Sequence, residues 1–472
     1  MPTSNPNLSS SKILRVIRQE LKNYHLFSEE PHQNVLELRA IKNQLETQSQ
    51  PNASFAKRLA LNTILHQALD KAYKESKDHA TLLRKRFLDK ETIPEVSDHF
   101  HISQATVSRW TDRALEIVAA KFIEIEKEAN ETWYNRLTAR LPARHYDRLV
   151  GVDRLRDQLT DKIVNPDGPG IIALSGIGGI GKSSLADYVV RKALRSGLFQ
   201  NVAWVAFRPE HEEWLLVKGA AKEQLISLLA HEVAPGASPL SIERQTERLT
   251  DRLKSEPHLI VIDNLEEQHE TDAIIQYLNG IENPSRFIVT TRAQPSRATC
   301  NVTNLTELSR EHSLNLMQYY LESTGQTQIG QVDESTLNKI FQIVGGNPLA
   351  LKITAGLMQW MPLEKIIGDL AKGQGDAAII YQKIFWYTWE TLSRESRLLL
   401  QAMSLTGAVS GASAAQMQEA SGLAEESFWR AVDELLLRSM LEVRGPINDR
   451  RYGIHRLTET FIETEIVDRG HD

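Results

Sequence analysis

Residues 176–183 read GIGGIGKS and meet every fixed position of the pattern G-x-x-x-x-G-K-[ST]. An apolar segment, IIALS, directly precedes this motif, and an amphipathic segment, SLADYVV, follows it. In such a strand–loop–helix unit the glycine-rich loop turns successive N–H groups inward, and the start of the helix adds a positive partial charge. The motif therefore predicts an α/β domain that binds phosphate groups at the end of its first strand.

Short apolar segments rich in β-branched residues alternate with longer amphipathic segments after residue 150. The four segments are IIALSG (171–176), VAWVAF (202–207), LIVIDN (259–264) and RFIVTT (286–291). Such alternation predicts a phosphate-loop NTPase fold, with a mainly parallel sheet and helices on both faces. We assign residues 149–305 to this nucleotide-binding domain. Beyond about residue 306 we expect helices and one hairpin at 440–455.

The phosphate loop, residues 176–183, supplies most of the groups expected to hold a nucleotide. Lys182 is expected to reach the β- and γ-phosphates, and the Ser183 hydroxyl is expected to bind Mg²⁺. No N-K-x-D tetrapeptide, the usual guanine-reading motif, occurs in the chain. The predicted cofactors are therefore ATP or ADP with Mg²⁺. The other candidate cofactor-binding residues in this segment are Gly176, Gly178, Gly179, Gly181 and Ser184.

Acidic and basic residues follow the next two predicted strands. Asp263, at the end of LIVIDN, is expected to bind Mg²⁺ through water. Glu266, or its neighbour Glu267, is expected to orient an attacking water, and Thr291 or Arg292 to sense the γ-phosphate. A surface position is the alternative for Glu266 and for Arg292. The candidate catalytic residues of a slow NTP hydrolase are therefore Lys182, Asp263, Glu266 and Arg292.

The composition excludes several other classes of protein. The chain has 472 residues, 41% of them hydrophobic, and a net charge of −6, which is typical of a folded soluble protein. No apolar run approaches the roughly 20 residues of a membrane span, and the first residues lack a signal-peptide pattern. Cys300 is the single cysteine, which excludes an internal disulfide and a cysteine-based zinc site. We expect a cytoplasmic protein that does not contact membranes.

Five motifs occur in a characteristic order: LVGVDRLRDQL (149–159), the phosphate loop, LIVIDN, TTR and GGNPLALKI (345–353). This order resembles the signal-transduction NTPases with an NB-ARC module, which include plant disease-resistance and animal apoptosome-type ATPases. The resemblance covers roughly residues 146–465. It implies that Val152 covers the adenine, and that Pro348 presses on the base from a helical domain at residues 306–380. By its sequence alone, Pro348 in N-P-L is a helix-start residue.

The same resemblance implies a winged-helix domain at residues 381–472. The segment YGIHRL (452–457) falls where the family has a Met-His-Asp motif, so His455 is expected to touch the β-phosphate of ADP and latch a closed state. Ile454 and Arg456 depart from that motif, and a structural histidine is the alternative. The expected third helix of this domain, at 424–440, has four acidic and two basic residues. Because DNA phosphates would repel this helix, we expect the domain to be a lid and not a DNA reader.

The first 150 residues hold 23 Lys and Arg against 19 Asp and Glu, whereas the rest of the chain is acidic. We expect a helical region at 1–76, a helix-turn-helix at 77–127 and a linker at 128–148. A short helix after Pro94, a turn at His101 and Ile102, and a third helix capped by Ser103 make the helix-turn-helix pattern. It resembles the DNA-reading end of bacterial sigma factors, which implies a bacterial type of NB-ARC protein. The candidate DNA contacts are Lys85, Arg86, Gln104, Thr106, Ser108, Arg109 and Arg113.

The charge of this helix-turn-helix argues against tight DNA binding. Residues 77–125 hold eight basic and eight acidic residues, so the strong basic footprint of a DNA-binding domain is missing. A helical adaptor that pairs with other proteins is the alternative. Several linked copies would compensate for weak DNA binding through their effective concentration.

Together these features predict an ATP- and ADP-dependent molecular switch. Bound ADP would hold the domains closed, and ATP with Mg²⁺ would favour an open form that self-associates and clusters the amino-terminal helices. Slow hydrolysis would reset the switch, with DNA binding in transcriptional control or defence signalling as the output. The rivals are a protein-interaction adaptor of a signalling assembly and a motor-like ATPase that remodels DNA complexes. Because the family usually continues into a long repeat array, we expect the sensor in the first 76 residues, in a partner, or outside this sequence.

Overall fold

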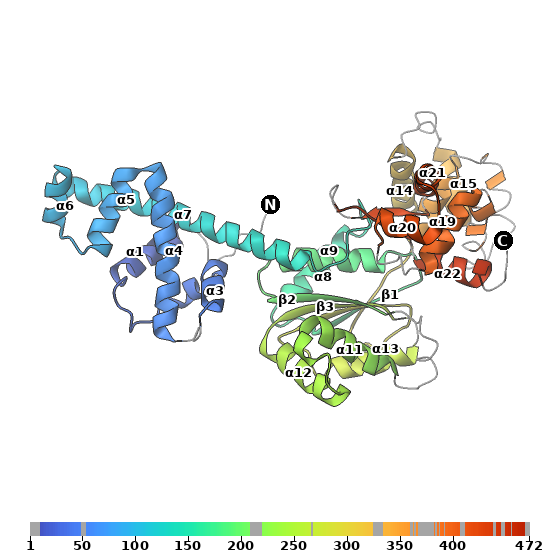
Figure 1. Ribbon diagram of the computed structural model, residues 1–472, viewed down its shortest axis with the longest axis horizontal. Helices are drawn as coiled ribbons and strands as arrows, with labels where there is room; N and C mark the ends of the chain where they lie inside the picture. The colour runs from blue at the N-terminus through green and yellow to red at the C-terminus, as the bar shows by residue number, and fades with distance from the viewer. Residues whose placement is uncertain are drawn as a thin grey trace. The chain divides into compact units, whose positions relative to one another are not determined.

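The computed structural model describes most of the chain, which divides into two compact units (Figure 1). One unit contains residues 1–139 and 194–197, and the other contains residues 140–193 and 198–472. No helix in the described part of the chain is both long and apolar enough to cross a membrane. The described residues are 10–48, 53–207, 220–265, 268–323, 334–358, 362, 365–366, 382, 385–386, 388–390, 392–405, 411–437, 440–444, 449–454 and 456–467.

The described residues of the first unit form helices and turns only. Apolar residues from α1, α3, α4, α5, α6 and α7 share one hydrophobic core. Helix α7 is 35 residues long and includes residues 128–138, which the sequence assigned to a linker. The elements are α1 (Ser10–Lys22), α2 (Gln33–Leu36), α3 (Arg39–Glu46), α4 (Ser54–Glu75), α5 (Lys77–Leu83), the π-helical turn η2 (Arg84–Leu88), α6 (Ile93–Phe100) and α7 (Gln104–Thr138).

Local sequence signals set the ends of α6 and α7. Thr92 and Glu95 form a capping box at the start of α6, and Pro94 stands in its first turn. His101 takes the left-handed conformation, with φ of 55°, and ends α6. The Ser103 side chain then accepts a hydrogen bond from the N–H of Thr106 at 3.2 Å and caps α7. The short helix, the turn and the cap lie where the sequence predicts them.

The second unit contains a five-stranded sheet with the order β2-β3-β4-β1-β5, in which all neighbouring strands are parallel. The four predicted strands are confirmed, and the fold class is the predicted one. The strand β5 was not predicted, because three of its four residues, NVTN, are polar; the first three are half-buried and the last is exposed. The strands are β1 (Ile171–Ser175), β2 (Asn201–Ala206), β3 (His258–Leu265), β4 (Arg286–Thr291) and β5 (Asn301–Asn304).

Helices cover both faces of this sheet. Figure 1 shows α8 (Asp153–Val164) and α9 (Lys182–Leu194) on one side of the strands, with α11 (Ala220–Val233), α12 (Ile242–Ser255) and α13 (Gln268–Leu278) on the other. The 3-10 turn η3 (Pro235–Ala237) joins α11 to α12. Apolar residues of α11, α12 and α13 form one core with β2, β3 and β4. Because the strands are parallel, the carboxyl ends of β1, β3 and β4 meet at one edge, where ligands of such sheets bind.

Helices also dominate the described residues after the sheet, and they share one hydrophobic core from Leu316 to Ile466. Strands β6 and β7 pair in antiparallel fashion after α19, α20 and α21, which is the hairpin predicted at 440–455. The Glu434 carboxylate accepts hydrogen bonds from the hydroxyl groups of Ser393 and Ser396 at 2.5 and 2.6 Å. The elements are α14 (Arg310–Ser323), α15 (Glu334–Val344), α16 (Pro348–Leu357), α19 (Arg394–Leu405), α20 (Ala414–Ser421), α21 (Glu425–Leu437), β6 (Glu442–Arg444), β7 (Arg451–Gly453), α22 (Arg456–Phe461) and η7 (Ile462–Val467).

Candidate nucleotide-binding site

The phosphate loop connects the end of β1 to the start of α9, as the sequence predicts. Gly179 and Gly181 have φ of 72° and 97°, values that residues with a side chain adopt only under strain. A Cβ atom at Gly179 would also lie 2.9 Å from the Cβ of Leu349. The loop therefore depends on glycine for its turn and for the close approach of another segment.

Lys182 is the first residue of α9, a helix of 13 residues. Its ammonium group donates hydrogen bonds to the carbonyl oxygens of Gly176 and Ile177 at 2.8 and 2.9 Å. The charge is thus held directly over the loop whose N–H groups would surround a phosphate. The role of Lys182 at the phosphates stays a prediction.

Asp263 lies at the end of β3 and faces the phosphate loop. Its Oδ1 atom accepts hydrogen bonds from the Ser183 hydroxyl at 2.7 Å and from the Thr290 hydroxyl at 2.5 Å. The Thr290 hydroxyl in turn accepts from the backbone N–H of Asn264 at 2.8 Å. The structure therefore brings Ser183 and Asp263 together, as predicted, and adds Thr290 as the residue that orients the carboxylate. Sequence reasoning missed Thr290 because TTR was interpreted only through Thr291 and Arg292.

The two candidates for sensing the γ-phosphate lie in different surroundings. Thr291 is fully buried, and its hydroxyl contacts the Thr271 hydroxyl at 3.2 Å and accepts from the N–H of Ala293 at 2.9 Å. Arg292 is exposed just after β4, and its N–H donates to the Leu265 carbonyl at 3.0 Å. Of the two, Arg292 has the accessible side chain. Glu266, Glu267 and His455 lie outside the described residues.

The start of α16 contacts the phosphate loop. Asn347 precedes this helix, is fully buried, and caps it by accepting from the N–H groups of Leu349 and Ala350 at 3.0 and 3.4 Å. The amide of the same side chain donates to the Gly178 carbonyl at 2.9 Å. Pro348, the predicted base contact, is the half-buried first residue of the helix. An asparagine before proline is an N-cap signal, so the cap was recognisable in the sequence, but its contact with the loop was not.

A cavity of about 370 Å³ lies beside the lead-in segment LVGVD. Gly151 lines it, with φ of 74°, and a Cβ atom there would lie 2.9 Å from Nδ1 of His312 on α14. Val152, the predicted adenine contact, is half-buried and stands between the lining residues Gly151 and Asp153. The volume is in the range of small-molecule pockets. Other lining residues are Arg144, Tyr146, Arg148, Arg156, Tyr188 and Asn315.

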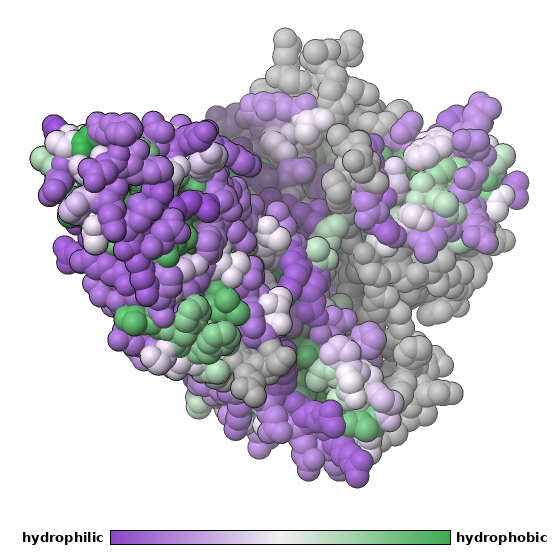
Figure 2. All heavy atoms as spheres, turned by 60° about the vertical axis from the view of Figure 1, so that its left-hand side comes forward, coloured by the Kyte–Doolittle hydropathy of each residue, from purple (hydrophilic) through white to green (hydrophobic). Residues whose placement is uncertain are grey.

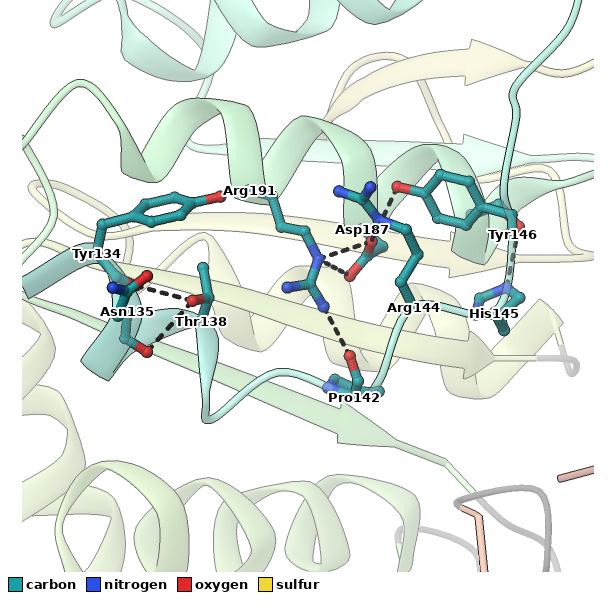
Figure 3. A network of polar contacts seen from close by, with 10 residues as sticks. Tyr134, Asn135, Thr138, Pro142, Arg144, His145, Tyr146, Asp187 and Arg191 are labelled. Carbon is teal, nitrogen blue, oxygen red and sulfur yellow. Dashed lines mark hydrogen bonds and ion pairs between the residues drawn. The ribbon is translucent and has the colours of Figure 1, made fainter. Parts of the chain in front are cut away.

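A second set of contacts reaches the start of α9 from residues 142–146, inside the predicted linker (Figure 3). The His145 ring lies 2.9 Å from the Ser184 hydroxyl, measured from Nε2. The Tyr146 hydroxyl donates to the Asp187 carboxylate at 2.9 Å. Sequence reasoning missed these residues because an extended segment without periodicity gives no signal of where it docks.

Mg²⁺ and a nucleotide fit the residues of this site. Space is open at Gly181, where an added Cβ would meet no atom within 4 Å. The Ser183 hydroxyl and the Asp263 carboxylate are the hard oxygen ligands that Mg²⁺ prefers. When bound there, Mg²⁺ would neutralise charge on the phosphate oxygens. Lys182 and the first N–H groups of α9 would hold the phosphates, and Asp263 would hold the metal.

The candidate DNA contacts lie in the first unit, on α7 and η2. Gln104, Ser108, Arg109 and Arg113 are exposed, whereas Thr106 is half-buried. Arg113 pairs with Glu116 at 2.8 Å, and Lys85 with Glu91 at 2.8 Å. The half-buried Arg86 side chain packs over the Phe87 ring at 5.6 Å.

Residues 152–324 match the protein family described as NB-ARC domain. This segment is therefore similar to NB-ARC domains. It contains the phosphate loop, Asp263 and Arg292, and it ends before Asn347. Similarity to this family supports nucleotide binding at the phosphate loop.

The related proteins are plant disease-resistance proteins. "Probable disease resistance RPP8-like protein 2" of Arabidopsis thaliana is 24% identical over 220 residues, which are 44% of this chain and 23% of that protein. "Disease resistance protein Pik-2" of Oryza sativa subsp. japonica is 24% identical over 264 residues, or 45% of this chain and 26% of that protein. The chain thus matches about a quarter of the length of these relatives.

Two solved structures show a weaker likeness. The Aeropyrum pernix ORC1 protein in complex with DNA is 15% identical with a TM-score of 0.33, over 70% of this chain and 97% of that one. Domain III of the Thermotoga maritima replication initiation protein DnaA is 12% identical with a TM-score of 0.30, over 51% of this chain and 93% of that one.

Proposed function

We propose that this chain is an ATP- and ADP-dependent molecular switch that self-associates when ATP replaces ADP. The observation that carries the proposal is the hydrogen bond from the Asn347 amide to the Gly178 carbonyl. Through it, a helix that follows the NB-ARC domain contacts the turn of the phosphate loop. A nucleotide bound in the loop would therefore change the position of that helix. A switch requires such a change of position, whereas simple hydrolysis does not.

In this proposal ADP stabilises the closed arrangement of the second unit, with His455 as a β-phosphate contact and Pro348 and Val152 against the adenine. ATP with Mg²⁺ at Ser183 and Asp263 favours an open arrangement. Glu266 and Arg292 support a slow hydrolysis that resets the switch. Turnover should lie well below about 1 s⁻¹, the low end of ordinary enzyme rates, which separates the switch from a motor-like ATPase.

The switch is tested by measuring the mass of the chain in solution with ADP and with a non-hydrolysable ATP analogue, each with Mg²⁺. We expect a larger mass with the ATP analogue only. Lys182→Ala is the control, since it should bind neither nucleotide and should stay at the mass of the ADP form. An identical mass in both nucleotides, with binding demonstrated, would refute the switch.

The proposed output is DNA binding by α6 and α7 in transcriptional or defence signalling. It is supported by the exposed row Gln104, Ser108, Arg109 and Arg113 at the start of α7, where a helix that follows a tight turn presents side chains to a groove. The names of the relatives favour a defence role. The test is a mobility-shift assay on random duplex DNA at two salt concentrations, with and without nucleotide. Arg109→Ala should weaken binding and reduce its salt dependence, whereas Arg15→Ala, an exposed arginine of α1, should not.

A specific observation favours the adaptor as second candidate. Figure 2 shows apolar residues gathered on an otherwise mainly hydrophilic surface. Among the exposed large apolar side chains of the first unit, Phe27 and Phe55 lie with ring centroids 5.4 Å apart. Exposed aromatic clusters mark protein interaction sites. In the shift assay, no binding and no salt dependence would favour the adaptor over the DNA reader.

A further inference from the structure

Residues 140–146, here called the belt, pass along helix α9 toward the phosphate loop. The Arg191 guanidinium donates to the Pro142 carbonyl at 2.7 Å, and one turn earlier in α9 Asp187 meets Tyr146. Nearer the loop, Ser184 meets His145 at 2.9 Å. Figure 3 shows Arg191 hydrogen-bonded to Pro142 and Tyr146 hydrogen-bonded to Asp187. The belt is therefore held at three levels of α9, and the contact nearest the phosphate loop is the one between His145 and Ser184.

Asp187 is the main anchor of the belt. Its side chain is 4% exposed, and its two oxygens accept from Nε of Arg191 at 2.8 and 2.9 Å. The Tyr146 hydroxyl donates to the same carboxylate, and Nε of Arg144 lies 4.0 Å from it. Burial, and then the charge of Asp187, raise the pKa of Tyr146, so the phenol keeps its proton. These contacts involve no group of the phosphate loop and should persist with or without nucleotide.

The contact between His145 and Ser184 differs, because Ser184 belongs to the phosphate site. Ser184 is the third residue of α9, so its N–H is one of the four without a helical partner, and these form the anion site at a helix start. A hydroxyl donates one hydrogen bond and accepts others, whereas a phosphate oxygen only accepts. With a phosphate nearby, Ser184 donates to it and must therefore accept from His145, whose Nε2 then carries the proton.

We propose that His145 is a positioning residue for the nucleotide, which orients the Ser184 hydroxyl toward the phosphates so that nucleotide binding and belt docking strengthen one another. The proposal rests on the proposed nucleotide binding at the phosphate loop. His145 lies outside the matched NB-ARC segment and outside the phosphate-loop pattern. By linkage, the factor by which docking raises nucleotide affinity equals the factor by which nucleotide favours docking. Since the chain passes from the first unit to the second between residues 139 and 140, occupancy of the site acts on the segment that follows this boundary.

The first measurement is the ADP affinity of the full chain by calorimetry. Loss of one hydrogen bond lowers a binding affinity by roughly a factor of five. His145→Ala should therefore weaken ADP binding about fivefold. His145→Gln keeps an N–H donor and should restore part of the affinity. His231→Ala is the control, since it removes an exposed histidine of α11 that lies outside the belt and the nucleotide site, and it should leave ADP affinity unchanged.

The second measurement is the rate of trypsin cleavage after Arg144, whose side chain is 52% exposed. Saturating ADP should slow this cleavage in the wild-type chain and in His231→Ala, and should leave its rate unchanged in His145→Ala. A merely structural His145 would alter the rate equally with and without ADP. Two results would overturn the proposal for His145 but not the proposed function. One is an ADP affinity of His145→Ala equal to that of the wild type, and the other is cleavage of the wild-type chain at a rate that ADP does not change. If the wild-type chain binds ADP no better than Lys182→Ala does, both the proposal for His145 and the proposed function are wrong.

Discussion

The side-chain amide of Asn347 donates a hydrogen bond to the carbonyl oxygen of Gly178 at 2.9 Å, across 169 residues of sequence. The same side chain caps α16 through the N–H groups of Leu349 and Ala350. Next to it, the N–H of Leu349 approaches the Gly179 carbonyl at 3.4 Å. One buried asparagine therefore fixes both the start of a helix and the turn of the phosphate loop.

This double role predicts different effects for two substitutions. Asn347→Ala removes the cap and the loop contact, and should lower the free energy of unfolding by about 1 kcal/mol. Asn347→Ser keeps a capping oxygen but is too short to reach Gly178, so it should retain most of the stability. Both should release ADP faster than the wild type. The measurements are urea unfolding and ADP dissociation after dilution, and unchanged release by the serine variant would contradict the role of the loop contact.

Thr290 is expected to control the response to Mg²⁺. Its hydroxyl donates to Asp263 and accepts from the N–H of Asn264, so Thr290→Val frees the carboxylate to rotate. Loss of a residue that orients a metal ligand typically costs 10- to 100-fold in metal affinity. We expect a weakening of about tenfold in the Mg²⁺ concentration that supports ATP binding. Thr290→Ser keeps the hydroxyl and should remain near the wild type, and equal effects of both changes would exclude the orienting role.

The sequence predicted the parts of the site whose signals are local. Buried strands appear as apolar runs, and the phosphate loop appears as a complete motif, so the sequence predicts that Ser183 and Asp263 lie close together, and the structure joins them by a hydrogen bond. The edge strand β5 was missed because NVTN carries no apolar run. The contacts of Asn347 with Gly178 and of His145 with Ser184 depend on where distant backbone segments pack. A single sequence holds no local pattern for such a contact.

Glu126 of α7 is expected to stabilise the first unit. Its carboxylate, 2% exposed, accepts from the N–H groups of Arg39 and Ala40 at 3.0 and 2.9 Å, at the start of α3. Helix α3 has no side-chain cap of its own. Glu126→Ala leaves both donors without this acceptor and should lower the free energy of unfolding by about 3 kcal/mol. Glu128→Ala, which removes an exposed carboxylate from the same helix, should change it little. The free energies of unfolding of the two variants are measured by urea unfolding followed by circular dichroism. Equal decreases in both variants would refute the capping role of Glu126.

His258, the first residue of β3, should make the second unit sensitive to acid. Its ring is fully buried, Nδ1 lies 2.9 Å from the Glu256 carbonyl and Nε2 has no hydrogen-bond partner. Burial lowers the pKa of His258 in the folded chain, below the usual value of about 6.5. The unfolded chain therefore binds the proton more readily as the pH falls below about 6.5, and the free energy of unfolding decreases there by at most about 1.4 kcal/mol per pH unit. Above that pH the histidine is neutral in both states and has no such effect.

Urea unfolding at a series of pH values should show a smaller decrease in the free energy of unfolding at acid pH for His258→Asn than for the wild type. His231→Asn, an exposed histidine of α11, should retain the full loss, and an identical acid dependence in all three proteins would exclude His258 as its source.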